Sequence, residues 1–152
     1  MDDTSRYPAL SPLARQAGFL GVLPFVAALA GVLSGSTELR LLAERLALGW
    51  GAAILAFVAA VHWGLALAGR WRWSLGVVIS STLPSLIGAL AVVLGGSRGT
   101  ALLLVGFGFF WLHEHRRHGE ELPPDYLQLR RVLSLTVCIL LALITIGLGE
   151  SS

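Results

Sequence analysis

The sequence contains no lysine, a single cysteine and few charged residues of any kind. Charged residues make up 13% of the 152 residues, and all 11 basic residues are arginine, whereas about a quarter of the residues of a soluble domain are charged. Because Cys138 is the only cysteine, the chain has no internal disulfide. The sequence also lacks a Walker loop, an HExxH motif and a CxxC motif, so we predict no enzymatic activity.

The sequence is rich in long apolar runs, and its mean hydropathy is +0.76. The run Leu48–Gly69 holds 22 residues without a charge, and as a helix it would be ~33 Å long, enough to cross a bilayer core of ~30 Å. We predict an all-α, polytopic integral membrane protein, a bundle of five transmembrane helices. The expected spans are residues 17–35, 48–69, 73–96, 99–115 and 132–149, between an N-terminal segment, 1–16, and a C-terminal tail, 150–152.

Three details of these spans are testable in a structure. We expect Pro24 to bend the first span without ending it, because neighbouring helices can satisfy the freed backbone groups. The stretch Thr37–Leu48 either extends the second span outward or lies in the interface. The run Thr100–Leu112 has only 13 uncharged residues, or ~20 Å of helix. Arg98 therefore snorkels, the bilayer thins, or the helix continues through residues 113–115.

Arginines near the spans predict the orientation of the chain. Eight of them lie on the side of the N-terminus and three on the other side, which places the N-terminus in the cytoplasm and the C-terminus outside. We expect the bacterial cytoplasmic (inner) membrane, and the lipid bilayer is the first partner. Interface anchors are expected where arginine and tryptophan flank a span, at Arg70, Trp71, Arg72, Trp73, Arg130 and Arg131. Arginines in such places do not predict binding to nucleic acid.

Small residues recur every four positions in the second and third spans, a pattern that allows close helix packing in lipid. We expect these two spans to form a central pair through Ala52, Ala56, Ala60, Gly64 and Ala68 on one helix and Gly76, Ser80 and Gly88 on the other. The alternative is that alanine and glycine are simply common in such helices.

One titratable side chain, His62, interrupts the second span, and a polar group inside a span is a candidate functional site. If the fourth span continues to residue 115, then His113, Glu114 and His115 reach a similar depth in the membrane. Three interpretations stay open for this cluster. They are a structural hydrogen bond of His62, ligation of a metal or haem by histidines, and a proton relay or quinone headgroup site with Glu114. Because His62 points away from the Ala52–Ala68 row, its expected partner is His113 or Glu114.

Several strings carry a resemblance to a known family. They are Gly21–Phe25 (GVLPF), Gly51–Phe57 (GAAILAF), Val61–Ala66 (VHWGLA), Leu83–Leu86 (LPSL) and Tyr126–Arg130 (YLQLR) after Leu122–Pro123. Over residues 17–148 the sequence resembles the family of small five-span membrane proteins typified by transmembrane protein 69. The resemblance implies the topology and an energy-converting type of membrane, and it adds no catalytic residue. Where an aspartate usually follows the fourth span in the family, this sequence has His113 and Glu114.

These observations give a leading hypothesis and two alternatives. Small size and short loops favour an accessory, scaffold or assembly subunit of a respiratory or photosynthetic membrane complex, in contact with other membrane subunits or with itself. The first alternative is a protein that binds a lipophilic ligand, quinone, haem or metal at the His62–Glu114 cluster, although no cofactor is required by any motif. The second is a small transporter that acts as an oligomer, because five spans are too few for an inverted-repeat pair.

Overall fold

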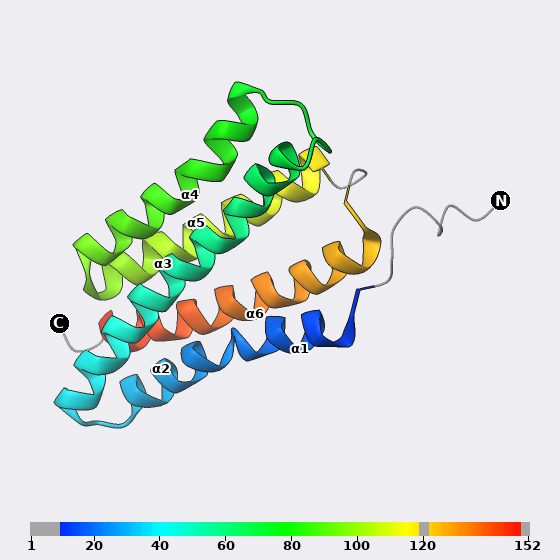
Figure 1. Cartoon of the computed structure of the whole chain (residues 1–152). Helices are drawn as coiled ribbons and strands as arrows, with labels where there is room; N and C mark the ends of the chain where they lie inside the picture. Colours follow the sequence, from blue (N-terminus) through cyan, green and yellow to red (C-terminus); the bar gives the residue numbers. More distant parts are fainter. Residues whose placement is uncertain (1–9, 119–121, 150–152) are drawn as a thin grey trace.

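The computed structural model describes residues 10–118 and 122–149, and these are almost entirely helical. The helices run antiparallel along one long axis, so that α1 begins and α6 ends at opposite ends of the bundle (Figure 1). Their bounds are α1 Pro12–Leu20, α2 Leu23–Leu33, α3 Thr37–Leu67, α4 Leu75–Leu94, α5 Gly96–His118 and α6 Pro124–Gly149.

Serine and glycine set most of the helix ends. Ser11, Ser36 and Ser74 stand at the N-caps of α1, α3 and α4, and each hydroxyl accepts a hydrogen bond from a backbone N–H of the first turn. Such caps satisfy donors that have no partner inside the helix. Gly95 and Gly96 adopt φ values of 63° and 52° between α4 and α5, a left-handed conformation that side chains disfavour. The tight turn therefore needs glycine at these positions.

The first predicted span is divided into two helices near Pro24, although residues 12–33 still form one apolar segment long enough to cross a membrane. α1 ends at Leu20 and α2 begins at Leu23, with Pro24 in its first turn. Proline has no N–H to continue the helix, and Phe25 N–H turns to the carbonyl of Val22. The Gly21 carbonyl instead accepts the indole N–H of Trp50 from α3 at 2.8 Å. A side chain of a neighbouring helix thus satisfies the broken turn.

The stretch from Thr37 extends the second span as a continuous helix, and α3 is 31 residues long. Two charges in this extension bind the ends of other helices. Glu44 accepts the N–H of Gly96 at the start of α5 at 2.7 Å, and Arg40 donates to the carbonyl of Gly147 near the end of α6. An anion at a helix N-terminus and a cation at a C-terminus are both favourable. These contacts explain why a charged segment belongs to the bundle.

Of the three possibilities for the short fourth run, the structure shows the continued helix. α5 spans 23 residues and passes through His113, Glu114 and His115 to His118. At ~1.5 Å per residue it is ~35 Å long. The side chain of Glu114 is thereby carried into the bundle on a regular helix.

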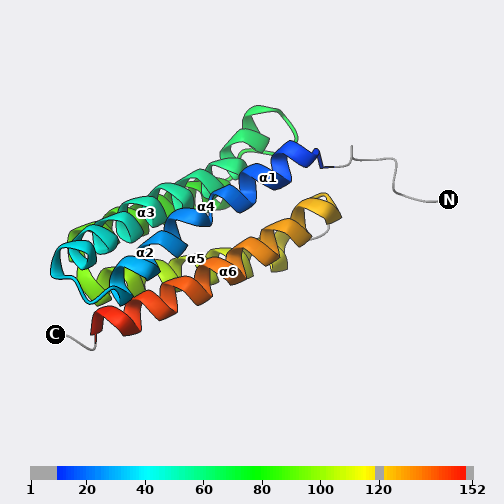
Figure 2. The ribbon, with the colours of Figure 1, turned by 90° about the horizontal axis from the view of Figure 1, so that it is seen from below.

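The helices pack around two apolar clusters. α3 contacts α2, α4 and α5, while α6 contacts α5, α2 and α1. Figure 2 shows α2 against the C-terminal part of α6 and α1 standing further from the N-terminal part of α6. The larger cluster joins Phe25, Leu55, Leu103, Phe107 and Leu141, and all five are nearly inaccessible. α3 lies in the middle of the bundle, and α4 lies at its edge.

The predicted row of small residues packs only at one end. An added Cβ on Gly88 would lie 3.0 Å from the Cα of Ala52, so α3 and α4 approach closely there. Ala56 is half-buried and Ser80 is buried, but Ala60, Gly64, Ala68 and Gly76 are exposed. An added Cβ on Gly64 would meet nothing within 4 Å. The prediction that these four exposed residues hold the second and third spans together is wrong, because at this end α3 buries Ala59, His62 and Ala66 instead, and a row spaced by four residues turns away around a helix of 3.6 residues per turn.

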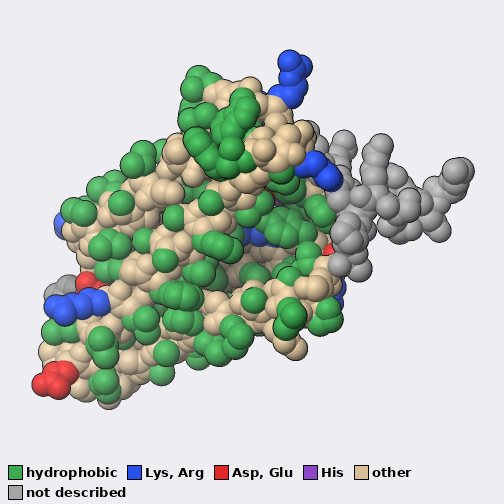
Figure 3. Space-filling view, in the orientation of Figure 1, with side chains coloured by type: hydrophobic (Ala, Val, Ile, Leu, Met, Phe, Trp, Pro, Cys, Tyr) green, Lys and Arg blue, Asp and Glu red, His purple; other side chains and the backbone are tan. Residues whose placement is uncertain are grey.

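The surface of the bundle is apolar along its length. Among the described residues, four helical segments are long and apolar enough to cross a membrane: 12–33 (α1 with α2), α3, α4 and α6. Large side chains such as Phe57, Leu86, Val93 and Ile139 are more than half exposed. Figure 3 shows hydrophobic side chains over this face and charged groups mostly toward its ends. α5 is long enough but carries more charge, so the five-span count and the orientation stay predictions.

Candidate ligand site in the helix bundle

The imidazole of His62 is completely buried and makes hydrogen bonds at both ring nitrogens. It projects from α3, where its Nδ1 lies 2.9 Å from the hydroxyl oxygen of Ser80 on α4. Its Nε2 lies 3.3 Å from Oε1 of Glu114 on α5. Of the alternatives left open by the sequence, the structure therefore shows a hydrogen bond between His62 and Glu114.

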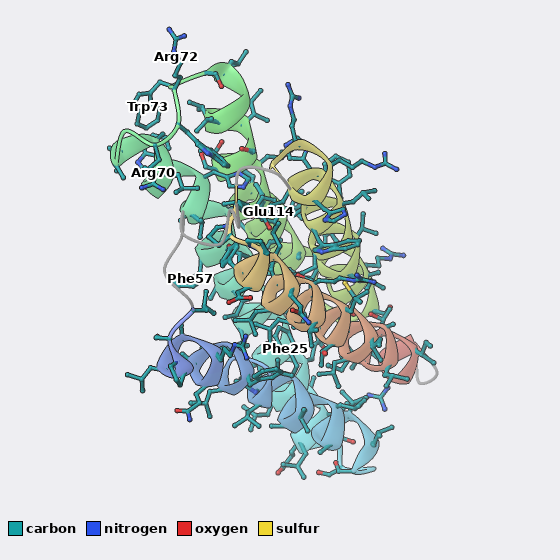
Figure 4. All side chains as sticks on the ribbon, turned by 90° about the vertical axis from the view of Figure 1, so that its right-hand side faces the viewer. Phe25, Phe57, Arg70, Arg72, Trp73 and Glu114 are labelled. Carbon is teal, nitrogen blue, oxygen red and sulfur yellow. The ribbon has the colours of Figure 1, made fainter. Side chains whose placement is uncertain are left out.

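The carboxylate of Glu114 is shared with a buried cation. Its second oxygen accepts a 2.8 Å hydrogen bond from Nε of Arg130 on α6, and the side chains of Arg130 and Glu114 are 9% and 1% exposed. Figure 4 shows Glu114 within the bundle, surrounded by helices. A buried carboxylate needs such a partner, since an unpaired charge in a low-dielectric interior is very costly. Four helices thus meet at one polar network, defined as Ser80, His62, Glu114 and Arg130.

Aromatic rings surround this polar network. The ring of Trp71 lies 5.1 Å from that of His62, and the ring of Phe110 lies 5.3 Å from it. The guanidinium of Arg130 also lies over Phe110, 5.3 Å from the ring centre, a distance at which a cation is attracted to the ring face. The rings keep the network in an apolar shell, which strengthens each polar contact inside it.

The protons on the ring of His62 decide the direction of the hydrogen bonds in the network. With Glu114 ionised beside Arg130, Nε2 of His62 carries the hydrogen and donates to the carboxylate. Nδ1 of a neutral ring then accepts from the Ser80 hydroxyl, which also lies 3.2 Å from the carbonyl of Val77. If the ring gains a proton, Ser80 accepts from Nδ1 and donates to Val77 instead. With a neutral ring, the charges of Glu114 and Arg130 cancel.

The neighbours of Glu114 on α5 do not share its position. Consecutive side chains of a helix point ~100° apart, so only one of residues 113–115 faces the centre. His113 is half-buried and stacks on Phe109, while His115 is exposed and stacks on Trp111. Within the described ranges, no three His, Cys, Asp or Glu side chains converge as metal ligands.

Of the predicted interface anchors, Arg130 is buried and Trp71 is half-buried. Arg130 is 8% exposed and pairs with Glu114, and Trp71 contacts His62. Sequence position alone did not separate them from true flanking residues, because both lie next to span ends. The remaining anchors, Arg70, Arg72, Trp73 and Arg131, are exposed, and Figure 4 shows Arg72 and Trp73 pointing outward at the α3–α4 connection. The signal that could have found Arg130 is the uncompensated charge of Glu114 in a predicted span.

A large cavity adjoins the network between α1, α3, α5 and α6. Its volume is about 790 Å³, within the range of small-molecule sites. Figure 3 shows this side of the bundle hollowed between the helices. Most of the wall is apolar, from residues including Gly18, Trp50, Val58 and Phe107, whereas α6 adds Tyr126, Arg130 and Ser134. No pattern in the sequence predicts this cavity, because it depends on where α1 lies relative to α6.

One string matches a catalytic pattern without its structural setting. Residues 95–99 read GGSRG, which fits GxSxG. That motif works as a nucleophile elbow on a sharp turn from a strand into a helix, but here it joins α4 to α5, and the described residues contain no strand. Its glycines serve the turn: a Cβ on Gly99 would lie 2.3 Å from the carbonyl oxygen of Ala91.

Fold and surface define the class: this is a multi-pass integral membrane protein with a buried polar network. A family described as protein of unknown function (DUF3429) matches residues 11–146, and the chain belongs to that family. Searches of curated proteins and of solved structures return no match.

Proposed function

We propose that this membrane protein binds a lipophilic small molecule in the cavity between α1, α3, α5 and α6. One observation carries the proposal: an apolar cavity of about 790 Å³ has a buried arginine in its wall. A site that is mostly apolar with a few polar groups to orient the ligand is the usual form of a small-molecule site. Direct ligation of haem or metal has less support, since the two bonded nitrogens of His62 already face Ser80 and Glu114.

Filling the cavity tests the proposal. Val58 lines the cavity from α3, so Val58→Phe takes part of its volume, and Val92→Phe makes the same change on the exposed face of α4. Protein purified from membranes is extracted with solvent and the lipophiles are quantified per mole of protein. We expect a stoichiometric lipophile in the wild type and in Val92→Phe, and several-fold less in Val58→Phe. Equal amounts in all three proteins would contradict the proposal.

An accessory or assembly role in a respiratory or photosynthetic complex of the bacterial inner membrane remains a second proposal. The exposed row Ala60, Gly64 and Ala68 supports it, because small residues on a helix face allow another transmembrane helix to approach closely. Purification in mild detergent followed by proteomics tests it, and a protein that repeatedly purifies alone would count against it. The likeness to the family typified by transmembrane protein 69 also stays a prediction, as does a cytoplasmic N-terminus.

A further inference from the structure

Three polar side chains of α6 face the cavity in one line. Tyr126, Arg130 and Ser134 are spaced four residues apart, a spacing that places them on the same face of a helix. Ser134 is 6% exposed and Arg130 is 8% exposed. The line therefore runs along the wall of the cavity and not along the protein surface.

Several hydrogen-bond donors on these three side chains have no partner among the described residues. Nε of Arg130 is used by Glu114, but the part of the chain that the structure describes offers no hydrogen-bond partner for its two terminal amino groups. The same holds for the hydroxyls of Tyr126 and Ser134 among the described residues. A guanidinium offers donors only, and the two hydroxyls can donate as well. Among the described residues no fully buried side-chain nitrogen or oxygen lacks a partner, so these groups are accessible from the cavity. In a site with mostly apolar walls they are stabilised by a ligand that accepts their hydrogen bonds.

The charges of Glu114 and Arg130 restrict which acceptor group of a ligand can bind these donors. Arg130 is already neutralised by Glu114, at 2.8 Å. With the ring of His62 neutral, a carboxylate or phosphate bound at Arg130 would lie near the Glu114 carboxylate and give the network of Ser80, His62, Glu114 and Arg130 a net negative charge. Like charges at close range in a low dielectric repel strongly. A neutral acceptor adds hydrogen bonds without that repulsion.

We propose that the cavity ligand is a neutral lipophile with a carbonyl group, such as an ester, ketone or quinone, whose oxygen accepts hydrogen bonds from Arg130 on α6. Tyr126 and Ser134 lie one turn to either side and extend the same donor line. The apolar wall from α1 and α3 holds the chain of the ligand. This inference rests on the proposed function, since it specifies the head group of the molecule that occupies the cavity.

The test compares three probes of similar chain length: methyl palmitate, palmitate and heptadecane. Each is added to the delipidated full-length protein in detergent at pH 8, and occupancy is measured by native mass spectrometry. We expect methyl palmitate to bind roughly tenfold or more tightly than heptadecane, the gain of one hydrogen bond to a charged donor. Palmitate should bind more weakly than its ester, because of the repulsion from Glu114.

A charge-neutral variant gives the control for the head group. Glu114→Gln combined with Arg130→Met removes the guanidinium donors and leaves no unpaired charge, and we expect it to lose most of the preference for the ester over the alkane. Equal binding of ester and alkane by the wild type would overturn the neutral-carbonyl head and leave the proposed function standing. Tighter binding of palmitate would also overturn it, as would a retained phospholipid that the ester cannot displace. Binding of none of the probes, with no lipophile retained from the membrane, would overturn the proposed function itself.

Discussion

At the residue scale, a partner of His62 near the end of the fourth span was predictable, whereas the choice of Glu114 and the contact with Arg130 were not. An isolated histidine in an apolar run is visible in the sequence, and helix length places Glu114 at a similar depth. The sequence cannot choose among residues 113–115 without the rotation of α5. It also cannot distinguish an arginine that flanks a span from one that turns inward, because Arg130 and Arg131 are adjacent, yet only Arg130 is buried.

The ion pair between Glu114 and Arg130 predicts a characteristic mutational pattern. Arg130→Gln and Glu114→Gln each leave a buried charge without its partner and should cost roughly 3–5 kcal/mol of stability. The double variant should be less destabilised than the sum of the two, because it removes both charges at once. Thermal unfolding of detergent-solubilised protein measures this. Arg131→Gln is the matched control and should change stability by less than about 0.5 kcal/mol. Additive effects of the two single changes would contradict the pairing.

At the element scale, helix existence was predictable and helix packing was only partly so. All five apolar segments form helices, and the extension of α3 from Thr37 is one of the two alternatives that its charge and leucine pattern predicted. The break between α1 and α2 depends on Trp50, which is 29 residues away from the carbonyl it binds. The row of small residues predicted the close approach of Ala52 and Gly88, but toward the connection α3 meets α4 through the buried His62 and not through this row.

Two glycine substitutions separate the packed part of the row from the exposed part. Gly88→Leu should lower the melting temperature in detergent clearly, since even a Cβ would lie 3.0 Å from the backbone of Ala52. Gly64→Leu, on the same predicted interface, should leave the melting temperature nearly unchanged, because nothing lies within 4 Å of the added Cβ. Similar losses for both variants would show that α3 and α4 pack along their whole length.

At the scale of the whole molecule, the membrane class follows from composition, whereas the cavity follows from tertiary structure. Four apolar segments and an exposed apolar surface define a multi-pass protein. The cavity needs α1 to stand apart from α3 and α5, a distance that no local pattern in the sequence specifies. Its wall then brings together a polar line on α6 and an ion pair shared with α5.

The central claim is that this cavity holds a molecule with its acceptor group on Arg130. An experimental structure of the protein purified from membranes without delipidation tests it most directly. We predict continuous non-protein density along Val58 and Ser134, ending within hydrogen-bond distance of the terminal amino groups of Arg130. A cavity closed by α1 packed directly against α3 and α6, with the guanidinium bonded only to protein groups, would contradict the claim.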